Sequence, residues 1–259
     1  SSSLEKLSTG LKINKASDDA SGLAIADKLR TQVTSINQGV SNGNSAIALL
    51  QIADKSMAEQ SKILDTVKAK LIQANTATTS ADGRESIRKD ITKLLEQLDN
   101  IAQQTNYNGN YLLQLDATSG AGATASLEFQ VGEKTSDMIT MSAVQANTTG
   151  LALTTLAGLA TSGLTTTVAQ TGQGSVDAAI TTLNGYRGDI GSTQNQVESA
   201  VRNLMTQATN IKNAESVIRD VDYAEESANF NKLNIISQAG SYAISQSNAV
   251  SQNVLRLLQ

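Results

Sequence analysis

Near the C-terminal end of the chain, mainly apolar residues recur at alternating spacings of three and four. The eight positions of this series are Leu233, Ile236, Gly240, Ala243, Ser247, Val250, Val254 and Leu257. This is the heptad pattern of a coiled-coil helix, with small or polar residues in its middle. An isolated helix of this length is barely stable in water, so partner helices are needed to cover the stripe. The pattern therefore predicts an assembly helix over residues 229–259, and we call the eight positions the terminal seam. The alternative is that they belong to an internal bundle core.

Helical spacing of apolar positions also runs through residues 29–74, 87–101 and 176–211. The first and third stretches are far longer than an average globular helix. Only a short polar segment separates the first from the second, and a short connection makes consecutive helices antiparallel neighbours. The expected fold class is mainly α, a long antiparallel helical rod of the bundle or coiled-coil type with a C-terminal assembly helix.

The helical pattern gives way to alternation between residues 126 and 145. Two alternating runs flank a Gly-Glu-Lys segment, which predicts a small β-hairpin region. Asn108-Gly109 predicts a turn, because Asn and Gly tolerate positive φ. Residues 148–174 are rich in Thr, Gly, Ala and Leu and are expected to be exposed and irregular.

These patterns divide the chain into six expected segments. They are an N-terminal connector (1–28), the N-terminal half of the rod (29–113), a β-hairpin with an exposed Thr/Gly-rich tip (114–175), a C-terminal rod helix (176–213), a charged joint (214–228) and the assembly helix (229–259).

Composition excludes several classes of function. The 259 residues include no His, Cys, Pro or Trp, and only two Phe and five Tyr. A chain without His or Cys has no Ser-His-Asp triad, no thiolate nucleophile and no Cys/His zinc site, so neither an enzyme nor a cofactor is expected. A net charge of −4 disfavours nucleic acid as a partner. No stretch reaches the ~20 apolar residues of a membrane-spanning helix, so no membrane insertion is expected.

Two groups of acidic residues have competing interpretations. Asp18 and Asp19 resemble a carboxylate pair for metal or acid–base chemistry, but capping of the first rod helix is the favoured interpretation. Arg219, Asp220 and Asp222 resemble a ligand cluster, but an ion-pair network at the joint is favoured over it.

Six segments match the signatures of one protein family in the right order. They are residues 7–14, 16–26, 105–109, 129–132, 214–226 and 252–258. In these segments the chain resembles bacterial flagellin. The family has further residues before the position corresponding to Ser1, so the chain is expected to be N-terminally truncated and unable, as it stands, to form a native filament.

The resemblance implies a structural subunit that polymerises into the extracellular flagellar filament used for motility. In this family the subunit is exported by the flagellar type III apparatus, and the two chain ends pair as a coiled coil in the filament core. The implied partners are further copies of the chain, an export chaperone on the C-terminal helix, the filament cap and the hook-associated proteins. The alternatives are a hook-associated junction protein and a surface adhesin built on a flagellin-like rod.

The resemblance also suggests two surface sites. Flagellins detected by the vertebrate Toll-like receptor present an Arg and a Leu where this chain has Asp65 and Ala69. A reversed charge should abolish pairing with an acidic receptor site, so the chain resembles the evading type. The alternative is that Asp65 is an ordinary solvated residue.

The second site is the Thr-rich tip, which is short and lacks the zinc protease motif that some flagellin inserts carry. Related flagellins can carry O-linked sugars in such a region, although composition alone is also that of an ordinary solvated loop. The glycosylation candidates are Thr161, Ser162, Thr165, Thr166 and Thr167.

Overall fold

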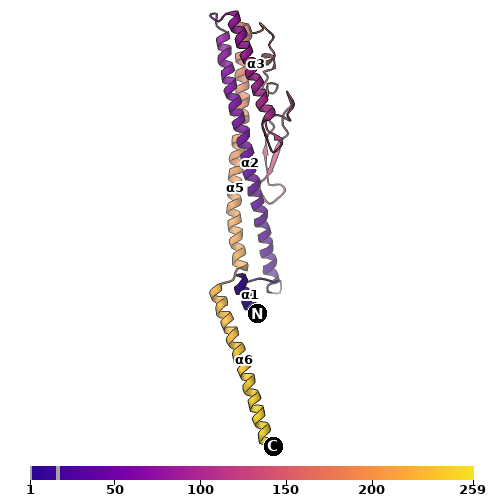
Figure 1. The fold of residues 1–259 in the computed structure, drawn as a ribbon, viewed down its shortest axis with the longest axis vertical. Helices are drawn as coiled ribbons and strands as arrows, with labels where there is room; N and C mark the ends of the chain where they lie inside the picture. The colour runs from indigo at the N-terminus through magenta and orange to yellow at the C-terminus, as the bar shows by residue number, and fades with distance from the viewer. Residues whose placement is uncertain (1, 16–17) are drawn as a thin grey trace. The chain divides into compact units, whose positions relative to one another are not determined.

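The computed structural model describes residues 2–15 and 18–259, and most of them are helical (Figure 1). The elements are α1 (Ser2–Thr9), α2 (Ala20–Ala74), α3 (Ala81–Gln104), β1 (Asn106–Tyr107), β2 (Asn110–Tyr111), β3 (Leu127–Gln130), β4 (Met138–Met141), α4 (Thr154–Ala157), α5 (Thr166–Arg219) and α6 (Tyr223–Leu258). The mainly α fold class with small antiparallel sheets is confirmed. The chain divides into two compact units, unit 1 with Ser1–Ser35 and Thr206–Gln259, and unit 2 with Ile36–Met205.

Unit 2 is built on helices in which buried side chains recur every seven residues. In α2 the fully buried positions Leu50, Met57, Leu64 and Leu71 are seven residues apart, and α5 repeats this interval with Ala169, Val176, Leu183, Ile190, Val197 and Leu204. α3 adds Ile91 and Leu98, again seven apart. A seven-residue interval keeps the apolar stripe on one side of each helix, so α2, α3 and α5 pack side by side (Figure 1).

Ion pairs on the surface of unit 2 connect the same helices. Arg187 of α5 pairs with Asp54 of α2 at 2.9 Å, Lys70 of α2 pairs with Asp90 of α3 at 3.1 Å, and Lys68 of α2 pairs with an aspartate of α5, Asp177. Pairs this exposed contribute little to stability, so the buried stripes carry the packing.

Two hairpins follow α3. The predicted hairpin is confirmed, because β3 and β4 are antiparallel with Leu127 opposite Met141 and Phe129 opposite Ile139. The Asn-Gly turn is also confirmed, because Asn108 and Gly109 have φ values of 52° and 84° and connect β1 to β2. Positive φ at both central positions is the type I′ geometry that matches the twist of the two strands.

Buried hydrogen bonds hold the segment after the hairpins against α2 and α3. The carboxylate of Asp99 accepts from the backbone N–H and the hydroxyl of Thr148 at 2.7 and 2.8 Å. The fully buried Gln60 donates to the carbonyls of Leu98 and Ala146 at 3.1 and 2.6 Å. Because an unpaired buried polar group is costly, these bonds fix where the irregular segment lies on the helices.

The long helices extend further than the sequence pattern predicted. α2 begins at Ala20 rather than near Leu29, because a capping aspartate precedes it. α5 spans Thr166–Arg219 rather than residues 176–213, and the segment expected to be irregular also contains α4. α5 starts early because Ala169 continues its buried seven-residue interval and Thr165 caps the first turn, accepting from the N–H of Val168 at 3.1 Å.

Gly43 of α2 gives a test of this packing. A Cβ added there would overlap a methyl group of Val201 on α5, whereas a Cβ added at Gly185 would meet no atom within 4 Å. Gly43→Ala should therefore lower the free energy of unfolding by about 1–3 kcal/mol. Gly185→Ala should raise it by about 0.5–1 kcal/mol, since alanine favours the helix. Urea denaturation would measure both, and changes of the same sign would contradict this account.

Candidate functional site

The terminal helix α6 buries none of its side chains. Every residue from 231 to 259 is exposed. The large apolar residues of the terminal seam are 48–86% exposed, namely Leu233, Ile236, Val250, Val254 and Leu257. A continuous bare apolar stripe of this kind marks an interaction surface.

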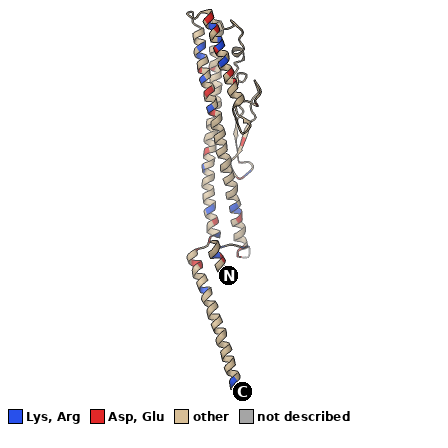
Figure 2. Cartoon of the chain, viewed as in Figure 1, with Lys and Arg blue, Asp and Glu red and all other residues tan. Residues whose placement is uncertain are grey.

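Several polar residues lie on the face of α6 opposite the seam. Successive helix residues turn by about 100°, which places Asn234, Gln238, Ser241, Ser245 and Gln252 away from the seam. No charged residue lies between Lys232 and Arg256, and this stretch of α6 is plain tan in Figure 2. This stretch of α6 is therefore uncharged, with the terminal seam on one side and polar residues on the opposite side.

Sequence reasoning missed a second set of exposed apolar side chains on α6. They lie outside the heptad positions and are Ile235, Tyr242, Ile244 and Leu255. The signal that could have identified them is the presence of large apolar residues at positions outside the heptad seam. A helix that is apolar on several sides is buried on several sides when it functions, so one partner helix would not cover α6.

The joint between α5 and α6 is held by the segment that follows α1. Val221 donates its backbone N–H to the carbonyl of Gly10 at 3.1 Å, and Asp220 pairs with Leu11 in an isolated antiparallel bridge. Arg219 donates to the carbonyl of Ile13 at 3.3 Å and lies 3.4 Å from a carboxylate oxygen of Asp27.

These contacts correct the network predicted among Arg219, Asp220 and Asp222. Arg219 pairs with Asp27 instead, and Asp220 takes part through its backbone. Asp222 caps α6, where its Oδ1 accepts from the N–H groups of Ala224 and Glu225 at 3.0 and 3.1 Å. A cap satisfies helix amides that have no partner within the helix, so the three residues serve the joint separately.

Helix α1 packs against the first turns of α6. The buried Ser3 donates to Glu226 Oε1 at 2.5 Å and accepts from Asn229 at 3.4 Å. Just after α1 the contact moves back along α6, because Gly10 lies so close to the Tyr223 hydroxyl that an added Cβ would overlap it. α1 therefore runs antiparallel to α6.

The capping prediction for Asp18 and Asp19 is confirmed for one of the two. Asp19 precedes α2 and accepts from the N–H of Gly22 at 2.9 Å. Asp18 accepts instead from the N–H groups of Asn14 and Lys15 at 3.0 and 3.1 Å, and these bonds lower the pKa of its carboxyl. Each carboxylate thus orders backbone in its own segment.

Neither a metal cluster nor a membrane span occurs in the described part of the chain. No three His, Cys, Asp or Glu side chains gather within residues 2–15 and 18–259 to hold an ion. Among the described helices, none combines the length and apolarity needed to cross a membrane.

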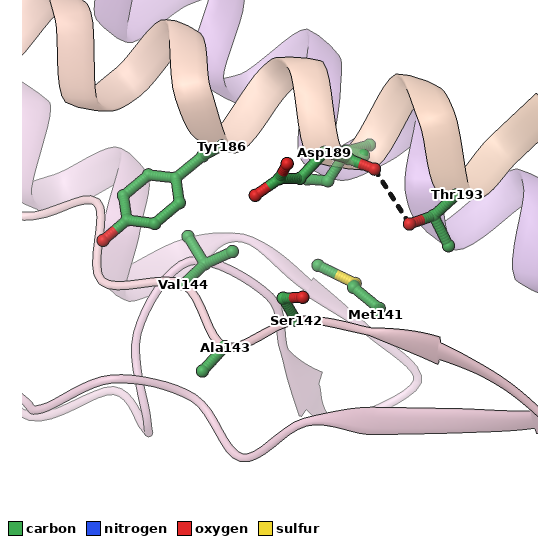
Figure 3. Close-up of a pocket in the computed structure, with 8 residues that line it drawn as sticks. Met141, Ser142, Ala143, Val144, Tyr186, Asp189 and Thr193 are labelled. Carbon is green, nitrogen blue, oxygen red and sulfur yellow. Dashed lines mark hydrogen bonds between the residues drawn. The ribbon is translucent and has the colours of Figure 1, made fainter.

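The cavity in Figure 3 lies between α5 and the segment after β4. Tyr186, Asp189 and Thr193 of α5 face Met141 and Val144 across it. Its volume is about 10 Å³, which is the room for about one water molecule. This cavity is therefore not a substrate site.

A charged clamp holds the loop between α4 and α5 to α3. Arg88 contacts Glu85 at 2.6 Å and donates to the carbonyl of Leu159 at 3.1 Å. Glu85 also accepts from the backbone N–H of Ser162 at 2.8 Å. These bonds, that of Arg88 first, lower the pKa of Glu85 to about 2.

The candidate surface residues all lie on exposed positions. Asp65 and Ala69 are exposed on α2. The five glycosylation candidates are exposed at the α4–α5 loop and the first turn of α5, namely Thr161, Ser162, Thr165, Thr166 and Thr167. Glycosylation stays a prediction, which an intact mass of the native protein without added sugar would contradict.

Comparison with known proteins decides the family. Residues 1–118 match the family described as bacterial flagellin N-terminal helical region, and residues 174–258 match the bacterial flagellin C-terminal helical region. Flagellin of Bacillus subtilis is 34% identical over 99% of this chain and 91% of its own length. The chain belongs to the bacterial flagellin family. Flagellin FlaB2 of Treponema pallidum is similar too, at 33% identity with the same coverage.

Solved structures agree with this assignment. The crystal structure of Bacillus cereus flagellin covers 68% of this chain and 94% of its own, with a TM-score of 0.55 and 28% identity. A flagellar hook-associated protein of Vibrio parahaemolyticus superimposes with a TM-score of 0.64 over 78% of this chain, but at 13% identity it shows the fold alone. The flagellin resemblance seen in the sequence is confirmed, and the chain is a structural subunit of the flagellar filament.

The Glu85 clamp makes this flagellin's tip loop sensitive to acid. Because folding lowers the pKa of Glu85 from 4.5 to about 2, the clamp contributes stability above about pH 4.5 and loses it as pH falls through about 2. The Ser162 amide signal in NMR spectra should therefore titrate with a midpoint near 2. In Glu85→Gln this titration should vanish, whereas Glu96→Gln, which alters an exposed carboxylate elsewhere on α3, should keep it. A Ser162 midpoint near 4.5 in the unaltered protein would contradict the clamp.

Proposed function

We propose that α6 is the element through which this flagellin joins the filament, its terminal seam packing on an antiparallel helix in the filament core. The observation that carries the proposal is the bare seam, since every seam position lies in the stretch of α6 where all residues are exposed. The antiparallel direction follows the one that α1 already takes along the first turns of α6.

The seam has the side chains for such packing. Burying each large aliphatic side chain contributes about 1.5–3 kcal/mol, and five of the eight seam positions carry one. The other three, Gly240, Ala243 and Ser247, are small and let a partner backbone approach closely. Ordering a 36-residue helix is costly in conformational entropy, so the gain comes only when partners cover α6.

The same surface explains the need for protection before assembly. A helix with bare apolar residues on several sides aggregates unless it is covered, which supports an export chaperone on α6. Extracellular location, type III export, a role in motility, and contacts with the filament cap and hook-associated proteins extend the proposal, and membership of the flagellin family supports them.

A junction protein is the second candidate. The resemblance to the hook-associated protein concerns the fold alone, whereas flagellin relatives match in sequence over nearly the whole chain. The filament role is therefore favoured over the junction role.

A charge in the seam tests the proposal. Ile236→Asp places a carboxylate among apolar partners and should abolish elongation of filament seeds, because burying an unpaired charge costs several kcal/mol. Ser245→Asp adds the same charge on the polar face of α6 and should elongate normally. Electron microscopy of seeded growth would compare intact flagellins carrying either change, with chaperone binding measured in parallel. Normal elongation by Ile236→Asp would contradict the assembly role of the seam.

A second proposal concerns Asp65 and Ala69. Both are exposed on one side of α2, one helical turn apart, where an acidic and a small residue would not engage an acidic receptor site. The chain therefore evades the Toll-like receptor that detects other flagellins.

Introducing the Arg and Leu of the detected flagellins tests this evasion. The double variant Asp65→Arg with Ala69→Leu should gain signalling in a receptor reporter cell, whereas the unaltered protein should give none. Glu59→Arg, a charge reversal at another exposed position of α2, is the matched control and should stay silent. Signalling by the unaltered protein would refute the proposal.

A further inference from the structure

A second surface of unit 2 has the form of a binding groove. It has a volume of about 320 Å³ and lies along β3, between α2 and the β1–β2 hairpin. The buried side chains of Ala46 and Leu49 line it on the α2 side. Tyr107 and Phe129 line it as well, although the whole chain has only two Phe and five Tyr. An aromatic-poor chain thus places two aromatic residues along one open groove.

The groove carries a single unpaired charge. Glu128 is the one charged side chain among the residues that line it. It is exposed, and its carboxylate forms no ion pair or hydrogen bond with the described residues. A groove with a carboxylate and no cation attracts a positively charged group and repels anions such as phosphate.

The edge of β3 is a poor site for an added strand. Asn42 of α2 donates to the carbonyl of Gln130 at 3.0 Å, so part of this edge is already bonded. Asn42 in turn accepts from Gln38 at 3.0 Å, which fixes its orientation. The groove therefore fits a side chain better than a strand that needs free backbone groups.

We infer that this groove receives a lysine side chain from a second copy of the chain in the filament. The apolar and aromatic lining suits the aliphatic stem of lysine, and Glu128 suits its ammonium group. The inference rests on the filament role, because only in a filament is a second copy held against every subunit.

The cations of unit 2 indicate lysine rather than arginine. All four arginines of this unit have partners within the chain, namely Arg84, Arg88, Arg187 and Arg202. Lys55, Lys89 and Lys134 are exposed, and none forms a side-chain ion pair with the described residues. Within unit 2, these three lysines are the available donors.

Cross-linking in filaments tests the inference. Filaments reassembled from a mixture of ¹⁵N-labelled and unlabelled intact flagellin would be treated with a water-soluble carbodiimide, which joins a carboxylate and an amine in direct contact. Mass spectrometry should find Glu128 of a labelled subunit joined to a lysine of an unlabelled one, and monomers should lack this peptide. Intact filaments in which Glu128 stays unlinked and reacts with added glycine ethyl ester as fast as in monomers would overturn the inference. That result would leave the filament role standing.

A charge reversal with a matched control gives a second readout. Glu128→Lys should lose the cross-link and slow elongation roughly tenfold or more, because like charges would then meet in the groove. Glu96→Lys makes the same change at an exposed position of α3 outside the groove and should elongate normally. Circular dichroism would confirm that both variants fold. Equal elongation rates for the two variants would overturn the inference.

Discussion

Unit 2 depends on the packing of α2 against α5, in which buried apolar side chains recur every seven residues along both helices. Leu50, Met57 and Leu64 on α2 share this interval with the residues from Ala169 to Leu204 on α5. Gly172 of α5 lies close to Leu71 of α2, and Gly43 of α2 lies close to Val201 of α5. Because this interval keeps each stripe on one side, both helices stay regular for more than 50 residues without a proline or an aromatic core. The hairpins, the tip loop and the groove along β3 are all held on this helical support.

The same periodicity has opposite consequences in unit 1. In α2 and α5 the stripes are covered within the chain, whereas in α6 the terminal seam follows the same rule and is covered by nothing in the described structure. The absence of charge between Lys232 and Arg256 increases the tendency of α6 to associate with partners, because charged residues would keep an isolated helix soluble. A pattern that builds a core in one part of the chain thus makes an assembly surface in another.

Periodic elements were predictable from the sequence, and elements that depend on a particular partner were not. The long helices, the β3–β4 hairpin and the turn at Asn108 follow from local patterns. The start of α5 was missed because Thr166 sits in a segment of low-complexity composition, where only the burial of Ala169 shows that the helix continues. On α3, alternating steps of four and three residues from Ile87 lead to Leu94, but Leu95 is the fully buried residue, since three-dimensional packing selects between adjacent leucines.

Of the functional site, too, only the periodic part could be predicted from the sequence. The seam was visible as a heptad, but the ion pair between Arg219 and Asp27 joins residues 192 positions apart, and no local pattern reports such a pair. The groove along β3 was invisible for the same reason, because α2, the β1–β2 hairpin and β3 meet only in the fold.

The central claim is that α6 is covered only by assembly, and hydrogen exchange of its backbone amides tests this most directly. The amides between residues 233 and 257 should exchange rapidly in the monomer, because no tertiary contact protects them, and should become strongly protected in the filament. Amides of α2 around Leu64, which is buried within the monomer, should be protected in both states. Equal protection of α6 in monomer and filament would contradict the account.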